Sequence, residues 1–201
     1  VPYLEWRHSS FVNDQSCQSC HMPVVEGSTP IASVWGQPRE QVSKHTFRGG
    51  NFFMQRMLNR YRDELGVQAL PQEMDAAVNR TIKHLETKSA YISISNAEIA
   101  ENELIADVNI ENLAGHKLPT AYPSRRVWIR FSVTDQNDDI IFESGAVMPD
   151  GSIAGNDNDR AGSHYEQHYS EITTEDQVQI YEAILVDPQD QVTTGLLTAI
   201  R

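Results

Sequence analysis

The chain has 201 residues and a mass of 22.7 kDa, which suffices for one large domain or two small ones with separate cores. Its hydrophobic content of 39% and mean hydropathy of −0.47 are typical of a soluble globular chain and exclude a largely disordered one. No apolar run approaches the length of about 18 residues that crosses a bilayer, so we expect no membrane span. The net charge of −12 argues against a nucleic-acid partner.

The charge is unevenly distributed along the chain. Residues 1–88 hold 10 basic and 9 acidic side chains, whereas residues 89–201 hold 6 basic and 19 acidic ones. Such a change in composition favours two modules. We therefore predict a first module over 1–88 and a second over 89–201.

The two cysteines of the chain lie three positions apart near its start. Cys17 and Cys20 are followed directly by His21, which gives the sequence C-x-x-C-H that is typical of c-type haem attachment. Two thiols one helical turn apart can each form a thioether with one haem vinyl group. The histidine after the second thiol can then bind the iron from one face. The pattern predicts one covalently bound haem c, with His21 as the proximal ligand.

Three other interpretations of the cysteine pair are weaker. A thioredoxin-like redox pair requires a βαβ context, which is not evident around residues 10–40. A zinc site lacks a second cysteine pair, and the histidine pair of suitable spacing, His164 and His168, lies far downstream in a polar loop. A structural disulfide across two intervening residues would be strained.

The rest of the first module indicates loops followed by two helices. Proline and glycine residues prevent long elements over 11–48. Apolar residues then recur with helical spacing over 51–65, after Asn51 as a good N-cap, and again over 72–88. We expect the apolar faces of these helices to pack against each other.

From position 90 the apolar period changes to two, which predicts strands. Alternation is clear over 104–110 and 127–133, and the polar stretch 135–138 predicts a hairpin turn into 140–142. Further strands are expected over 91–97, 178–186 and 192–200. The spacing favours an antiparallel, immunoglobulin-like β-sandwich, so the expected fold class is α+β: a small helical haem-binding module followed by this sandwich.

Several longer motifs accompany C-x-x-C-H. They are CQSCHMP from Cys17, HTFRGGN from His45, AGHKLPT from Ala114, RRVW from Arg125, YEQHY from Tyr165 and QVQIYE from Gln177. Together they resemble bacterial multihaem c-type cytochromes over nearly the whole chain. The resemblance implies an electron-transfer protein outside the cytoplasm, with two histidines on the haem iron and a β-sandwich beside it.

The chain departs from that pattern because it has a single C-x-x-C-H site and begins at Val1. We therefore expect a processed piece of a longer multihaem cytochrome, or one module of an assembly. The expected partners are redox proteins or neighbouring haem-bearing chains, and the expected location is the periplasm or the cell surface.

Several histidines are candidates for the sixth ligand of the iron. His45 and His116 are the leading candidates, because both lie in family motifs and in expected loops. The remaining candidates are His8, His84, His168 and a methionine. Met22 is excluded, because it adjoins His21 and cannot reach the opposite face of the haem.

Weaker candidates surround this central pattern. Asn156 to Asp159, in the loop 149–176, could hold a cation such as Ca²⁺, although a solvated acidic loop is the better interpretation. Arg125 and Arg126 could pair with haem propionates. Trp35 and Phe47 could pack on the haem or belong to an ordinary core.

Two classes of function remain open from the sequence. A six-coordinate haem would carry electrons, whereas a haem with an open sixth position would serve a catalyst or a sensor of small ligands. No residue pattern supplies an evident catalytic group beside the haem, which favours electron transfer over enzyme activity.

Overall fold

The computed structural model describes residues 1–156, 164–193 and 195–200. The contacts of the backbone divide the chain into two compact units, Pro2–Lys117 and Leu118–Arg201. The charge composition changes at 88/89, whereas the unit boundary lies at 117/118, because a long hairpin after the last helix belongs to the first unit. In the described part of the chain, no helix is both long enough and apolar enough to cross a bilayer.

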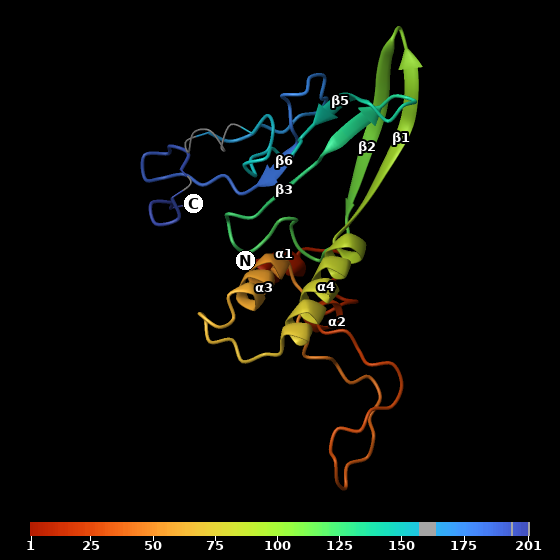
Figure 1. The fold of residues 1–201 in the computed structure, drawn as a ribbon, viewed down its shortest axis with the longest axis vertical. Coiled ribbons are helices and arrows are strands. Elements are labelled where there is room, and N and C mark those ends of the chain that lie inside the picture. The colour runs from red at the N-terminus through yellow and green to blue at the C-terminus, as the bar shows by residue number, and fades with distance from the viewer. Residues whose placement is uncertain (157–163, 194, 201) are drawn as a thin grey trace. The chain divides into compact units, whose positions relative to one another are not determined.

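The first unit begins with four helices: α1 (Pro2–Arg7), α2 (Cys17–His21), α3 (Phe52–Arg60) and α4 (Pro71–Lys88). The predicted N-cap is confirmed, since Asn51 Oδ1 accepts the Met54 N–H at 3.3 Å. α3 is shorter than the predicted helix and is followed by turns. α3 and α4 pack side by side (Figure 1), as their apolar spacing indicates.

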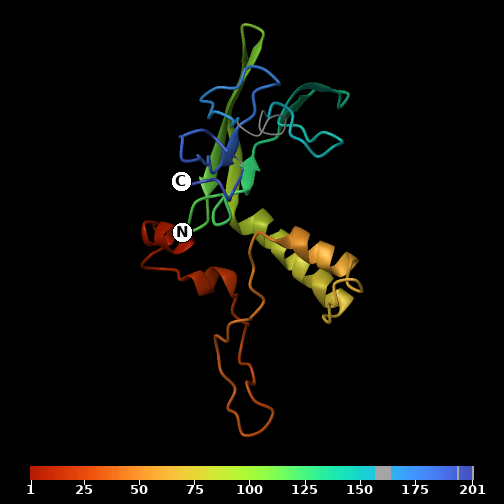
Figure 2. The ribbon, with the colours of Figure 1, turned by 90° about the vertical axis from the view of Figure 1, so that its left-hand side faces the viewer.

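A long excursion of the chain separates α2 from α3. Its two arms are joined by short antiparallel bridges, Val24 with Ser43 and Thr29 with Arg39. Figure 2 shows this excursion extending away from the helices of the first unit. Its ends meet near α2, because Lys44 N–H donates to the Pro23 carbonyl oxygen at 2.9 Å. The segment after the excursion is thereby brought against the C-x-x-C-H helix.

The first unit ends in a hairpin of two long strands, β1 (Ala90–Ala100) and β2 (Glu103–Asn112). The turn between them has Glu101 and Asn102 at φ of 52° and 68°, the left-handed pair that a tight hairpin requires. The register shifts between Ser95 and Glu98, where β1 carries a bulge.

The described residues of the second unit form four short strands in two antiparallel pairs. β3 (Arg126–Trp128) pairs with β6 (Ile180–Glu182), and β4 (Phe131–Thr134) pairs with β5 (Ile140–Ser144). The predicted turn over 135–138 is confirmed as the connection between β4 and β5. The buried cluster of this unit consists of Ile153, Val178 and Ile180, with Trp128 packed against it.

The mixed α+β class with antiparallel strands is confirmed, but the single sandwich is not. Among the described residues the strands form three separate two-stranded sheets. One cause is the interruption between β3 and β4: the Ile129 N–H still donates to the Gln179 carbonyl oxygen at 3.0 Å beside the β3–β6 pair, whereas Phe131 begins the pairing with β5, so the alternation of 127–133 is divided between two sheets. A second cause is that, among the described residues of the expected strand over 192–200, strand pairing is limited to one bridge, between Val186 and Val192.

Substitution in β4 tests the orientation of this strand. Phe131 is half-buried and meets the Phe142 ring edge-on at 6.4 Å between centroids, whereas Ser132 is exposed. We expect Phe131→Ala to lower the free energy of unfolding by about 1–3 kcal/mol, less than for a fully buried phenylalanine. Ser132→Ala is the control and should stay within about 0.5 kcal/mol of the wild type. Urea unfolding measures both, and equal effects would contradict this orientation of β4.

Candidate haem site

The C-x-x-C-H sequence forms the short helix α2. Ser16 caps its start, since Ser16 Oγ accepts the Ser19 N–H at 3.3 Å. Cys17 and Cys20 are exposed free thiols, so the disulfide interpretation is not realised in this structure. A spacing of three residues on a helix places both thiols on the same side. The two sulfur atoms are therefore accessible on one side of the helix that carries His21.

The ring of His21 is fixed by the segment that follows the excursion. Its Nδ1 contacts the Arg48 carbonyl oxygen, and the Arg48 N–H donates to the His21 carbonyl oxygen at 3.0 Å. When Nδ1 donates its proton to that carbonyl, the lone pair of the neutral ring is on Nε2. A histidine that binds a metal through one ring nitrogen usually donates the N–H of its other ring nitrogen to an acceptor such as a backbone carbonyl. In that tautomer, His21 would bind a metal through Nε2.

Two further imidazoles lie close to His21. The His84 ring, from α4, has its centroid 6.0 Å from that of His21, with planes 49° apart. The His116 ring, from the loop after β2, lies at 6.3 Å with planes only 10° apart. With metal–nitrogen bonds of about 2.0–2.1 Å and ring centres about 1.1 Å further out, opposite imidazoles on one metal have centres about 6.3 Å apart. The separation of the His21 and His116 rings would therefore suit two histidine ligands of one metal ion.

The loop that carries His116 is anchored from both ends. Asn112 Nδ2 donates to the His116 carbonyl oxygen at 2.8 Å, and Asn112 Oδ1 accepts the Ala114 N–H at 3.0 Å. On the other side the Lys117 N–H donates to Glu5 Oε2 at 3.1 Å. Gly115 lies so close to α1 that an added Cβ would be 3.2 Å from Trp6 Cδ1. The N-terminal segment thus helps to position the His116 loop.

The other predicted ligands lie elsewhere. His45 is exposed, and its ring meets Phe47 edge-on at 5.9 Å rather than the ring of His21. His168 packs against Tyr181 at 5.3 Å in the second unit. Phe47 and Trp35 are themselves exposed, which excludes them from the core of the described structure. Of the two leading candidates, the structure brings only His116 to His21.

Sequence reasoning missed the two polar residues that flank Phe47. Arg48 Nε and Thr46 Oγ1 are buried, and neither atom has a hydrogen-bond partner within the described ranges. Buried polar atoms of this kind are costly unless a ligand or water satisfies them. The motif HTFRGGN contains both residues, but only its histidine is a common metal ligand. The sequence alone therefore does not indicate that Thr46 and Arg48 belong to the site.

Electrostatics favour a neutral His84. Burial lowers the pKa of the His84 imidazole, and the charges of His21, Arg48 and Lys88 lower this pKa further. A lowered pKa means that the ring is deprotonated at neutral pH, which is the form that binds metals. His84 is therefore a chemically competent alternative to His116.

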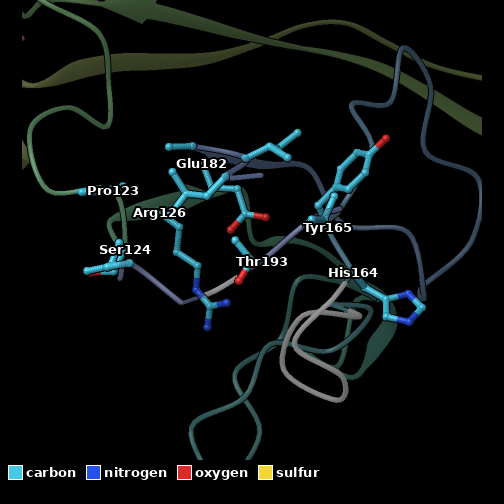
Figure 3. A pocket seen from close by; sticks show the side chains of 12 residues that line it. Pro123, Ser124, Arg126, His164, Tyr165, Glu182 and Thr193 are labelled. Carbon is cyan, nitrogen blue, oxygen red and sulfur yellow. The ribbon is translucent and has the colours of Figure 1, made fainter. Parts of the chain in front are cut away.

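Within the described ranges no group of three or more histidine, cysteine or acidic side chains is arranged to hold a bare metal ion. Two weaker candidates from the sequence are distinct from the group of His21, His84 and His116. The proposed cation loop rests on Asp157 to Asp159, which lie outside the described residues. Arg126, a candidate for haem propionates, lines a pocket of about 230 Å³ in the second unit, where it is the cross-strand neighbour of Glu182 (Figure 3).

Comparison of the chain with protein-family models, with curated proteins and with solved structures finds no match.

The anchoring of the His116 loop leads to a local prediction. Asn112→Ala removes both hydrogen bonds of its side chain to the loop, so the Ala114 amide should exchange with solvent several-fold faster. The free energy of unfolding should fall by about 0.5–1.5 kcal/mol. Asn109→Ala is the matched control on the same strand, because its side chain donates to Ser95 and not to the loop. Hydrogen exchange of the 113–117 segment measures the effect, and unchanged exchange in the Asn112 variant would contradict the anchoring role.

Proposed function

We propose that the chain is a c-type cytochrome that carries one haem, attached by thioethers to Cys17 and Cys20, and that it transfers electrons. The proposed axial ligands are His21 and His116. One observation carries the proposal: the histidine of the C-x-x-C-H helix is held through Nδ1 by a backbone carbonyl and is paired with a near-parallel imidazole at 6.3 Å. The exposure of both thiols supports covalent attachment.

The residues of the site suit an electron carrier better than a catalyst. Haem supplies a one-electron couple between ferrous and ferric iron when it is bound. With His21 and His116 both on the iron, no position would be open to a substrate, and the hydrogen bonds of Asn112 and Glu5 to the His116 loop would hold the second ligand in place. The alternative, a haem enzyme or a sensor of small ligands, requires an open sixth position. The visible spectra described below distinguish it from an electron carrier.

Arg48 is the residue best placed to neutralise a haem propionate. Its backbone is fixed against His21 in both directions, and its buried Nε lacks a partner in the described part of the chain. A guanidinium forms strong charge-assisted hydrogen bonds with carboxylates. We therefore propose Arg48, in place of Arg125 or Arg126, as the propionate partner.

The motifs of the chain support a wider setting for this carrier. We propose that it is a module or fragment of a bacterial multihaem cytochrome of the cell envelope, with redox proteins or haem-bearing neighbours as partners. We also propose that the unit Leu118–Arg201 is of immunoglobulin-like type. The antiparallel pairing of its strands and the packing of Trp128 on Val178 and Ile180 support this class.

Alanine variants identify the sixth ligand through the visible spectrum. We expect the wild type to be low-spin and unaffected by carbon monoxide, since both axial positions are filled. His116→Ala should become high-spin and bind carbon monoxide, whereas His45→Ala, the matched control in a family motif, should retain the wild-type spectrum. A high-spin spectrum in His84→Ala with a low-spin His116→Ala would assign the position to His84 instead. A high-spin wild type would contradict the electron-carrier proposal.

The ligands also predict the direction of the redox potential. Two histidines donate more strongly to ferric iron than a histidine and a methionine, and the acidic excess of 89–201 favours the ferric state as well. We therefore expect a midpoint potential below zero against hydrogen. Redox titration should show a higher midpoint in His116→Met, and a lower or equal value would contradict His116 as the ligand.

A further inference from the structure

The hairpin β1–β2 presents a continuous apolar face to solvent. Ile92 and Ile94 are each 59% exposed, and Ile99 is 80% exposed. The hairpin face, as we call it here, consists of Ile92, Ile94, Ile99, Leu104, Ala106, Val108 and Ile110. None of these residues is buried in the structure. Figure 1 shows the two strands as a long paired ribbon that continues from the end of α4.

The strand register places these side chains on one side of the hairpin. Ile92 pairs with Ile110, Ile94 with Val108, and Ile99 with Leu104. The isoleucines of β1 change from even to odd positions along the strand, and the bulge between Ser95 and Glu98 compensates for this change. The bulge therefore keeps the apolar face continuous along the whole hairpin.

The opposite side of the hairpin is mostly polar. Asn109 Nδ2 donates to Ser95 Oγ at 2.8 Å, and Asn96 Nδ2 donates to Asp107 Oδ2 at 2.6 Å. Ser93 lies across from Asn109 on this side. An isolated two-stranded hairpin is at best marginally stable in water, so a hairpin with one apolar side requires a covering layer.

The exposed area is sufficient for a stable contact between two copies. If a fully exposed Ile or Leu presents roughly 180 Å², the five most exposed large aliphatic residues of the hairpin face offer roughly 500 Å² per chain. They are Ile92, Ile94, Ile99, Leu104 and Ile110. Two such faces bury about 1,000 Å² together, which reaches the lower limit for a specific interface before any flanking contacts are added.

The chemistry of the face favours a second copy over another kind of partner. The chain carries a net charge of −12, yet no acidic or basic side chain belongs to the hairpin face, so two copies can meet there without opposing like charges. A face without charge matches the composition of homodimer interfaces, which are more apolar than those of transient complexes. A twofold axis brings each face against the same face of the other chain.

We propose that the chain forms a twofold homodimer in which two hairpin faces pack against each other, giving a four-stranded sandwich with two strands from each copy. The strands of each copy supply the layer that the other lacks. Packed sheets of this kind lie about 10 Å apart, with the apolar side chains interdigitated between them. The proposal does not depend on the haem, because the hairpin face contains none of the candidate ligands.

Sedimentation velocity of the full-length holoprotein between about 1 and 100 μM tests the proposal, with the haem absorbance recorded in the same runs. We expect a dimer of twice the chain mass at the upper end and dissociation on dilution. Ile94→Lys should weaken the dimer at least tenfold. Ser93→Lys places the same charge on the polar side of the same strand and should retain the wild-type dimer.

Circular dichroism and the haem spectrum show whether each variant is folded. If Ile94→Lys fails to fold, the milder Ile99→Ser, near the tip of the hairpin, should still weaken the dimer several-fold. A wild type that remains monomeric at about 100 μM, with slow hydrogen exchange over 90–112, would show that another part of the same chain covers the face and would overturn the proposal. A dimer that survives in folded Ile94→Lys would place the interface elsewhere and would also overturn it.

Discussion

The contact between the His21 ring and the Arg48 carbonyl joins two segments that lie 27 positions apart and fixes the site around them. It aligns the C-x-x-C-H helix with the segment that leads into α3, and a second hydrogen bond, from the Arg48 N–H to the His21 carbonyl oxygen, joins the same two residues. α4 then contributes His84, and the loop after β2 contributes His116. A change in the His21 ring position would alter its spacing to both imidazoles at once, so the remaining geometry depends on this junction.

Local signals were sufficient for the parts of the fold that depend on neighbouring residues. Asn51 caps α3, as expected for an asparagine side chain that can accept a backbone N–H. The helix expected over 72–88 from its apolar spacing agrees closely with the bounds of α4. The turn over 135–138 is also local, because Asp135 Oδ1 accepts the N–H groups of Asn137 and Asp139. In each case the stabilising contacts lie within a few positions, where residue type is informative.

Long-range features were less predictable. Alternation over 127–133 indicates which side of a strand is apolar, but it cannot reveal that the chain passes from one sheet to the next between Ile129 and Phe131. The choice among histidines had the same difficulty: His45 and His116 both lie in loops, and only the tertiary contacts of Asn112 and Glu5 distinguish the loop that reaches His21. The hairpin face shows the opposite case: its alternation is evident from the sequence, but the sequence does not reveal that, among the described strands, β1 and β2 pair only with each other.

The central claim is covalent attachment of one haem at Cys17 and Cys20, and mass spectrometry tests it most directly. The protein is denatured in acid and organic solvent, which releases any haem that is held only by coordination. We expect the mass of the denatured polypeptide to exceed that of its sequence by one haem. After digestion, the added mass should be on the peptide that contains both cysteines. A denatured polypeptide with the mass of the unmodified sequence, or two free thiols on that peptide, would contradict it.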